Sequence, residues 1–300
     1  MSEEELKEYH GSCHCGNFAY TVTVPEIKGG SRCNCSVCHR KGYIHLRITP
    51  EQFKADEGTG ELASYQFSEG SIHHFFCATC GSGVMGSKVD KSFMVVNLNT
   101  IKDLDKKSLE VKTFDGASIG EPYKTFDVPT DALEALDLPD YKTYTGHCHC
   151  GDVKVAFKSP DLYDLSTFIV SDDCSICTIV SFPIFSAHAP PPQPSPSQPN
   201  PRQHAYVLAY PERHHYQITG VENTTAYFMG DKWLAHRFCK NCGTPTFLDT
   251  QSGPPAHVLA KVPDSFHSRL RAYPTTLRVI NGLDWKKLGI NGVAPDKGAA

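Results

Sequence analysis

The chain reads Gly11-Ser12-Cys13-His14-Cys15-Gly16 near its start, and Gly146-His147-Cys148-His149-Cys150-Gly151 repeats this pattern about 135 positions later. A second motif recurs in the same way, because Phe76-Cys77-Ala78-Thr79-Cys80-Gly81 corresponds to Phe238-Cys239-Lys240-Asn241-Cys242-Gly243. A glycine follows each cysteine pair, as in a metal knuckle, where the chain turns so that its N–H groups face thiolate sulfur. The repeat divides the 300 residues into two copies of ordinary domain size.

Between these motifs the two copies carry different numbers of cysteines. The first copy has Cys33, Cys35 and Cys38, whereas the second has only Cys174 and Cys177, with Asp172 at the position of Cys33. Four thiolates close a tetrahedral zinc site and make it structural, while three leave one coordination position open for water or substrate. The first copy can therefore supply both kinds of site.

We expect the thirteen cysteines to bind zinc rather than to form disulfides or a redox dithiol. The acidic start Met1-Ser2-Glu3-Glu4-Glu5 lacks the apolar core of a secretory signal, and no apolar run is long enough to cross a bilayer. We therefore expect a cytoplasmic, reducing environment, in which an odd number of closely spaced cysteines is typical of metal sites. Thiolate-rich sites could also hold iron or copper(I).

The composition gives little indication of a macromolecular partner. The net charge of −4 provides no global attraction to nucleic acid or to an anionic membrane, although a local basic patch remains open. The chain also lacks a basic tract with interleaved aromatic residues, which would follow a nucleic-acid strand. We expect neither a nucleic-acid nor a membrane partner, and the oligomeric state is not indicated.

Short alternating segments predict a mainly β fold, made of antiparallel sheets with few short helices and stapled by zinc. The expected strands cover residues 17–24, 43–48, 94–98, 152–157 and 277–280. Short helical turns are expected at residues 50–53, 104–109 and 130–136.

The two copies also differ in the length of their central segments. Cys38 lies 39 positions before Cys77, whereas Cys177 lies 62 positions before Cys239. The excess coincides with the proline-rich residues 180–203, and removing these 24 residues leaves a spacing of 38. We expect a first domain at 9–127, a linker at 128–143 and a second domain at 144–290, interrupted by a flexible insertion at 180–203. A translated intron would explain the same segment.

The ordered cysteine motifs, together with Cys38-His39-Arg40-Lys41-Gly42 and Val95-Val96-Asn97-Leu98, resemble the glutathione-dependent formaldehyde-activating family, which includes centromere protein V. The resemblance covers nearly all of residues 9–125 and extends less well over 144–290. The second copy departs from the pattern at Asp172, in the proline-rich segment and after Gly243.

In that family, the first and last cysteine pairs hold a structural zinc, and the central three cysteines hold a catalytic zinc. The resemblance thus implies closed sites in both copies and an open site in the first, with the ligands Cys13, Cys15, Cys77 and Cys80; Cys148, Cys150, Cys239 and Cys242; and Cys33, Cys35 and Cys38. A weaker site in the second copy would use Asp172, Cys174 and Cys177. Since Asp172 and Asp173 add negative charge there, we expect this site to be empty or weakly metallated, the second copy to be a degenerate structural partner, and each chain to hold about three zinc ions, with room for a fourth.

The function that the resemblance implies is a zinc-dependent carbon–sulfur lyase, which handles adducts of glutathione or a similar small thiol with formaldehyde or a related electrophile. The candidate substrate contacts flank the triad or follow the family motifs: Arg32, His39, Arg40, Lys41, His74 and Asn97. The cations could bind carboxylates, or they could be ordinary surface residues. His39 could instead occupy the fourth zinc position or move a proton.

The alternative function is a non-catalytic, zinc-stabilised binding module like centromere protein V. Among the other histidines, we expect those within the first knuckles to point away from the metal: His14, His147 and His149. His73, His214 and His215 are expected at the surface.

Overall fold

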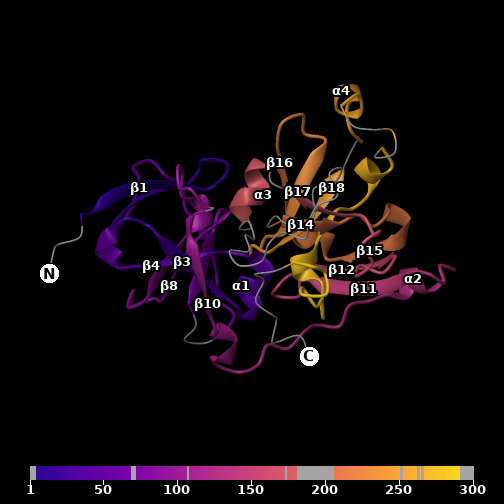
Figure 1. Ribbon diagram of the computed structural model, residues 1–300, viewed down its shortest axis with the longest axis horizontal. Helices are drawn as coiled ribbons and strands as arrows, with labels where there is room; N and C mark the ends of the chain where they lie inside the picture. The colour runs from indigo at the N-terminus through magenta and orange to yellow at the C-terminus, as the bar shows by residue number, and fades with distance from the viewer. Residues whose placement is uncertain are drawn as a thin grey trace.

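The computed structural model describes residues 5–68, 72–106, 108–172, 174–180, 206–250, 253–261, 264 and 267–290. Within these ranges the protein is mainly β, with several antiparallel sheets and few short helices, which confirms the predicted fold class. The two halves of the chain lie side by side, the first running from indigo to purple and the second from magenta through orange to yellow (Figure 1). The predicted insertion lies outside the described residues except for Val180.

The first half contains two sheets. Strands β1 (Lys7–Ser12), β2 (Ala19–Val24) and β5 (Phe53–Ala55) form a three-stranded antiparallel sheet. The second sheet has seven strands, in the order β10 (Glu110–Phe114), β3 (Gly29–Cys33), β4 (His45–Ile48), β9 (Met94–Asn97), β8 (Gly83–Ser87), β7 (His73–Phe76) and β6 (Ala63–Tyr65). Its pairs are antiparallel except β10 with β3, which run parallel.

The second half repeats this arrangement without a counterpart of β10 among its described residues. Its three-stranded sheet consists of β11 (Lys142–His147), β12 (Lys154–Ser159) and β15 (Tyr216–Thr219). Its six-stranded sheet has the order β13 (Ile169–Asp172), β14 (Tyr206–Ala209), β19 (Thr275–Thr276), β18 (Pro245–Thr250), β17 (Leu234–Cys239) and β16 (Thr224–Phe228).

The helices are all short. The α-helices are α1 (Ser36–Lys41), α2 (Asp131–Glu134), α3 (Ser175–Val180) and α4 (Ala256–Leu259). The 3₁₀ turns are η1 (Pro50–Gln52), η2 (Leu98–Thr100), η3 (Gly116–Ser118), η4 (Arg213–His215), η5 (Val221–Asn223), η7 (Arg269–Arg271) and η8 (Leu277–Val279). None of the helices in the described ranges combines the length and the apolar character that a bilayer crossing would need.

Two local predictions are wrong. The described part of residues 104–109 contains no helix: the Ser108 N–H donates to the Asp105 carbonyl, and Lys106 Nζ reaches back to the Asn99 carbonyl at 2.7 Å, so these residues form a turn. Residues 277–280 do not form a strand either. The Thr276 hydroxyl accepts a hydrogen bond from the Arg278 N–H, which starts the 3₁₀ turn η8 directly after the two-residue strand β19. The predicted turns at 50–53 and 130–136 appear as η1 and α2.

Each half has a hydrophobic core that includes its knuckle cysteines. In the first half Tyr20, Val22 and Ile44 are fully buried together with Cys77, and in the second half Phe157 and its neighbours surround buried Cys148, Cys239 and Cys242. Strand β2 alternates between buried and half-buried residues, as its sequence predicts. A metal at either knuckle would therefore be bound within the core.

The halves contact each other through reciprocal pairs of elements. Helix α1 of the first half packs on η8 of the second, and α3 of the second half packs on η2 of the first. The rings of Phe76 and Phe238 meet edge to face with centroids 6.5 Å apart. Gly81 lies against the Phe238 ring and Gly243 against the Phe76 ring, both at positive φ, so that a side chain at either position would clash.

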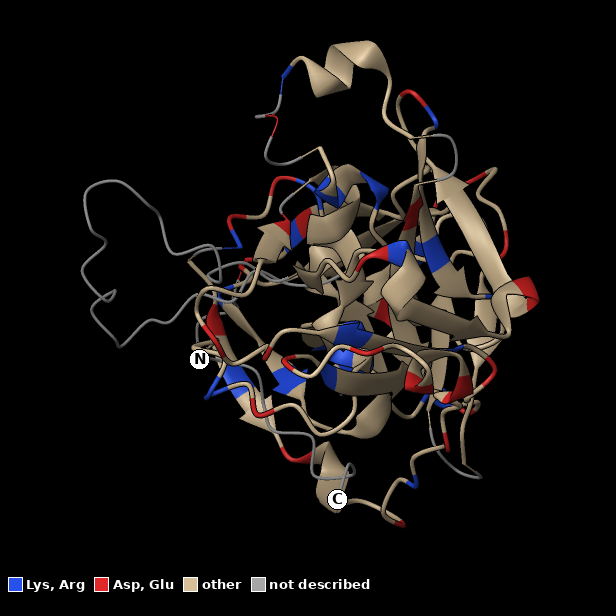
Figure 2. Ribbon diagram, turned by 90° about the vertical axis from the view of Figure 1, so that its right-hand side faces the viewer, with Lys and Arg blue, Asp and Glu red and all other residues tan. Residues whose placement is uncertain are grey.

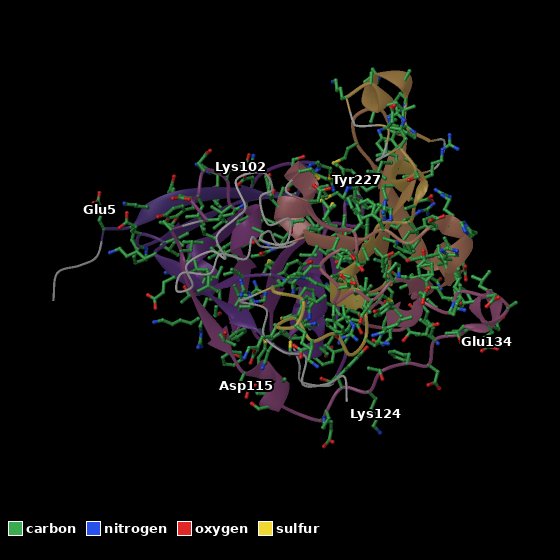
Figure 3. All side chains as sticks on the ribbon, turned by 45° about the vertical axis from the view of Figure 1, so that its right-hand side comes forward. Glu5, Lys102, Asp115, Lys124, Glu134 and Tyr227 are labelled. Carbon is green, nitrogen blue, oxygen red and sulfur yellow. The ribbon has the colours of Figure 1, made fainter. Side chains whose placement is uncertain are left out.

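Two histidines from the knuckles form matching hydrogen bonds across this interface. His14 bonds to Tyr227 at 2.8 Å and to Ser175 at 2.9 Å, while His149 bonds to Tyr65 at 2.9 Å and to Ser36 at 2.8 Å. Tyr227 lies at the junction of the two halves (Figure 3). Both imidazoles thus bind the opposite half and not their neighbouring cysteines.

Candidate metal centres

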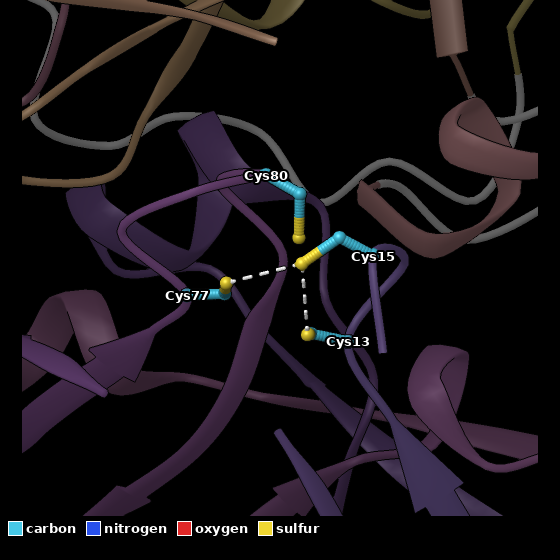
Figure 4. Close-up of side chains that lie close together, drawn as sticks. All are labelled: Cys13, Cys15, Cys77 and Cys80. Atoms are coloured by element: carbon cyan, nitrogen blue, oxygen red, sulfur yellow. Dashed lines mark hydrogen bonds between the residues drawn. The ribbon is translucent and has the colours of Figure 1, made fainter. Parts of the chain in front are cut away.

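The two closed sites are built by turns that join adjacent strands. Cys13 and Cys15 follow β1, and Cys77 and Cys80 lie between β7 and β8; their four sulfurs converge on one point (Figure 4). The sulfur of Cys15 lies 3.6 Å from that of Cys13 and 3.7 Å from that of Cys77. A tetrahedron with Zn–S bonds of about 2.3 Å has edges of roughly 3.8 Å, so the thiols fit a zinc ion.

The matching site of the second half has the same geometry. Its sulfurs are 3.5 Å apart both for Cys148 with Cys150 and for Cys150 with Cys239, and Cys242 completes the group. The N–H of Val153 donates to Cys148 Sγ, as the N–H of Phe18 donates to Cys13 Sγ, each at 3.3 Å. Such hydrogen bonds stabilise the thiolate form that a metal requires.

Lys41 links the halves electrostatically. Its side chain is fully buried, and burial lowers the pKa of its ammonium group, while the sulfurs of Cys242 and Cys38 act in the opposite direction. Burial opposes ionisation of Cys242, but hydrogen bonds from the other thiols of its cluster and the charge of Lys41 hold its pKa well below the usual range. Lys41 therefore lies within electrostatic range of a closed site and of the central triad, and the surface alternative for it is wrong.

The central site of the first half comprises Cys33 at the end of β3, Cys35 before α1 and Cys38 within α1, with all three sulfurs within 4.8 Å of one another. Hydrogen bonds from Cys35 and Cys38 lower the pKa of Cys33 to about 3. The Cys35 N–H also donates to Cys33 Sγ at 3.4 Å. Three thiols with a stabilised thiolate form a donor set that fits zinc with one position left open.

Strand β10 and η3 cover one side of this triad. Phe114 pairs with Cys33, and Asn34 fixes the following turn, since its amide donates to Asp115 Oδ1 at 2.6 Å and its carbonyl accepts from the Ala117 N–H at 2.9 Å. Gly116 packs directly against Cys33, so that a Cβ atom there would clash with the sulfur. This cover has no counterpart among the described residues of the second half.

Two arginines lie on or against the elements that carry the triad: half-buried Arg32 precedes Cys33 in β3, and buried Arg278 of the other half packs on α1. Burial lowers the pKa of Arg32 to about 10, and burial together with the charge of Arg32 lowers that of Arg278 to about 9. Arg278, in η8, donates from Nη1 to the His39 carbonyl at 2.9 Å. The sequence did not single out Arg278, because only the packing of η8 on α1 brings it here.

His45 is a second residue that the sequence analysis did not single out. It is buried next to the triad, and burial lowers its pKa to about 4, although the charge of Cys33 acts in the opposite direction. A neutral imidazole therefore faces the triad. Its inward position in an alternating strand, two residues after Tyr43, was the available signal.

The remaining candidates near the triad are buried at the interface. The His39 ring meets Trp285 of the second half edge to face, with centroids 5.8 Å apart. The Arg40 guanidinium lies over the Tyr123 ring at 4.9 Å and donates to Asn281 Oδ1 at 3.5 Å. Arg40 is 2% exposed, so the surface alternative is wrong for this residue too.

The other candidate residues make contacts that hold the fold together. The Asn97 amide donates to the Gly83 carbonyl at 2.8 Å, and its side-chain oxygen caps η2 by accepting from the Asn99 N–H. His74 is buried against Phe67, and burial holds its pKa well below the usual range. His215 was expected at the surface but is buried against Tyr141, because the ring fills the space beside the three-stranded sheet.

The central site of the second half has an unexpected member. Cys174 and Cys177 have sulfurs 3.1 Å apart, and His236 from β17 lies within 4.8 Å of both. The predicted ligand Asp172 accepts a hydrogen bond from the Cys174 N–H at 2.9 Å and is not part of this group. The signal for His236 was its place three residues before Cys239, which matches that of His74 before Cys77.

Outside these sites, neither the distribution of charged residues nor the shape of the described surface points to a further centre. Acidic and basic residues are interspersed along both halves (Figure 2). An open, mostly apolar hollow of about 640 Å³, lined by Phe18, Phe53, Phe75 and Met85 among others, contains none of the clustered cysteines. The chemistry-bearing residues therefore gather at the knuckles and along the interface.

Comparison with known proteins gives two matches. Residues 8–115 match the family model described as "Glutathione-dependent formaldehyde-activating enzyme". A solved structure of a Rhodobacter sphaeroides protein is 27% identical, and the alignment covers 35% of this chain and 99% of that chain with a TM-score of 0.32. The family match ends at residue 115, directly after Phe114, which pairs with Cys33. It includes every cysteine of the first half.

Proposed function

Since residues 8–115 belong to the glutathione-dependent formaldehyde-activating family, we propose that the first half joins glutathione, or a similar small thiol, to formaldehyde or a related small electrophile. Cys33, Cys35 and Cys38 would hold the zinc of this reaction. The observation that carries the proposal is the convergence of these three thiols without a fourth protein ligand among the described residues.

The reaction forms one bond to sulfur. Cys33, Cys35 and Cys38 would hold a zinc ion, which when bound would lower the pKa of an incoming fourth thiol. The substrate thiolate attacks the carbonyl carbon, the electrons of the C=O π bond move to oxygen, and that oxygen takes a proton from water to give a hydroxymethyl thioether. The reverse reaction breaks the carbon–sulfur bond, so the activity is formally that of a lyase.

The surroundings of the triad support an anionic substrate. Arg32 directly precedes Cys33 in β3 and interacts electrostatically with buried Arg278, which donates to the His39 carbonyl of α1, and Arg32 Nε is without a hydrogen-bond partner. A guanidinium group can bind a carboxylate through two parallel hydrogen bonds, which suits the carboxylates of glutathione.

The second half is proposed to be a tandem copy of the same domain, with limits near 144 and 290 and a closed zinc site of its own. The support is its strand order, which matches that of the first half apart from β10. In this proposal the second half also contributes to the first site, because Arg278 and Trp285 pack on α1.

The test is exchange spectroscopy with ¹³C-formaldehyde and glutathione, which measures how fast the adduct forms and breaks. The zinc-loaded protein should accelerate exchange, and Cys35→Ser should reduce the rate to that of buffer. The matching variant Cys174→Ser should have the smaller effect, because it alters the other half. Acceleration that survives in Cys35→Ser would contradict the assignment. The alternative function, a non-catalytic binding module, would be favoured if the zinc-loaded protein did not accelerate adduct exchange.

A further inference from the structure

We propose that the second half binds a zinc ion of its own through Cys174, Cys177 and His236, with one coordination position open. This proposal does not require the first half to be active. From sequence alone we expected this centre to be empty or weakly metallated, with Asp172 as the third ligand. That expectation does not hold for a site in which His236, and not Asp172, joins the two cysteines.

The three side chains come from two elements that the fold holds together. Cys174 precedes α3 and Cys177 lies within it, while His236 projects from β17, and their ligand atoms all lie within 4.8 Å of one another. Cys177 is fully buried, and His236 is 7% exposed. Two thiols and an imidazole form an established zinc ligand set that leaves a fourth position for water or substrate.

Asp172 replaces the missing cysteine as the acceptor of a backbone hydrogen bond and not as the third member of the metal group. In the first half the Cys35 N–H donates to Cys33 Sγ, and in the second half the Cys174 N–H donates to the Asp172 carboxylate. The carboxylate therefore holds the turn before α3, as the sulfur does before α1. The Asp172 side chain also hydrogen-bonds to the Cys177 thiol, but the group whose ligand atoms all lie within 4.8 Å of one another takes its third member, His236, from β17.

The first half offers an internal comparison for His236. His74 occupies the same register, since Tyr65 pairs with His74 as Tyr227 pairs with His236. His74, however, stacks on Phe67 and is not part of the group formed by the three thiols. At this matched register, the imidazole joins the group of central cysteines only in the half that lacks the third thiol.

The ligand set determines what the open position would accept. Zinc with two thiolates and a neutral imidazole has a formal charge of zero, whereas the three thiolates of the first half leave a charge of −1. A neutral centre is the stronger Lewis acid and suits an oxygen ligand, such as water or a carbonyl group, better than a second anionic thiol. The two halves would thus hold open centres with different ligand preferences.

The test counts metal ions in the full-length protein. Protein kept under reductant, loaded with zinc and dialysed against metal-free buffer should retain four zinc ions per chain by mass spectrometry of the metal, and His236→Ala should retain three. His236→Cys restores a third thiol and should return the count to four. Asp172→Asn and the register-matched control His74→Ala should both retain four.

A cobalt-loaded sample provides an independent measurement, because each thiolate ligand adds to the sulfur-to-cobalt absorption. His236→Cys should increase that absorption, whereas His74→Cys should not. If His236→Ala does not fold, Cys174→Ser should still lose one metal ion. The proposal is overturned if the wild-type protein holds three ions and His236→Ala also holds three, or if Asp172→Asn loses an ion that His236→Ala keeps. Recovery of a Cys174–Cys177 disulfide from reduced, zinc-loaded protein would also overturn it and indicate a redox dithiol.

Discussion

At the scale of single residues, the central site of the first half is defined by what contacts Cys33. Hydrogen bonds from Cys35 and Cys38 stabilise its thiolate, Gly116 packs on its sulfur, and His45 lies beside it. The cysteines themselves could be grouped from their spacing, because knuckle motifs are local. Gly116 and Arg278 could not, since Gly116 reaches Cys33, and Arg278 reaches helix α1, only through contacts between distant segments.

Gly116→Ala should displace Cys33 and weaken the central zinc site. The added Cβ atom would clash with Cys33 Sγ, and a misplacement of about 1 Å near reacting atoms can lower a rate by roughly 100-fold. We expect one zinc ion fewer per chain and slower adduct exchange. Gly60→Ala is the control, because its Cβ atom would meet only the exposed side chain of Asn17, which can move away. Equal metal content in the two variants would contradict the proposed packing.

His45 should make stability depend on pH in the acidic range. Burial lowers its folded-state pKa to about 4, whereas an unfolded histidine titrates near 6.5. Between these values the unfolded chain binds the extra proton, so the free energy of unfolding falls as the pH drops from 6.5 toward 4. Denaturant titrations at several pH values should show a smaller fall for His45→Gln than for the wild type. Parallel curves would show that His45 titrates in the folded protein as it does in the unfolded chain.

At the scale of elements, alternating strands and knuckles were predictable because their signals lie within a few residues. Strand β2 and turn η1 follow their sequence patterns. Residues 277–280 were mistaken for a strand, since their apolar β-branched composition is the same in a strand and in a buried 3₁₀ turn; the deciding contact is the Thr276 cap. The parallel pairing of β10 with β3 depends on a long connection and has no local signature.

Asn34→Ala should loosen η3 from the triad. The variant removes the two hydrogen bonds that the buried Asn34 side chain makes to Asp115 and Ala117, and each bond contributes about 0.5–1.5 kcal/mol net. Urea titration should therefore show a lower free energy of unfolding. Ser92→Ala, whose side chain bonds only to exposed Asp90, is the control. A loss no larger than that of Ser92→Ala would mean that η3 is held by other contacts.

At the scale of the whole molecule, the halves form one unit through reciprocal contacts. His14 and His149 each bond to a tyrosine and a serine of the opposite half, and each knuckle glycine accommodates a phenylalanine from it. The repeat could be found in the sequence, but this pairing could not, because the hydrogen-bonded partners are separated by 84 to 213 residues. The packing of the two halves also explains why Arg40 and Lys41 are buried instead of solvated.

Gly243→Ala should destabilise this interface. Its Cβ atom would clash with the Phe76 ring, and overpacking of this kind costs about 1–3 kcal/mol. Gly282→Ala is a matched control, since Gly282 has nearly the same φ, 67° against 69°, and no atom within 4 Å of an added Cβ. Both variants bear the backbone penalty, so the difference between their unfolding free energies measures the packing. Equal destabilisation would contradict a tight contact between the halves.

The central claim is that Cys33, Cys35 and Cys38 hold a zinc ion with room for a substrate thiol. A crystal structure of the zinc-loaded protein soaked with glutathione tests it most directly. The account predicts the glutathione sulfur at about 2.3 Å from a zinc ion bound by these three cysteines, with a carboxylate near Arg32 or Arg278. Three metal-free thiols, or a glutathione sulfur bound elsewhere, would contradict it.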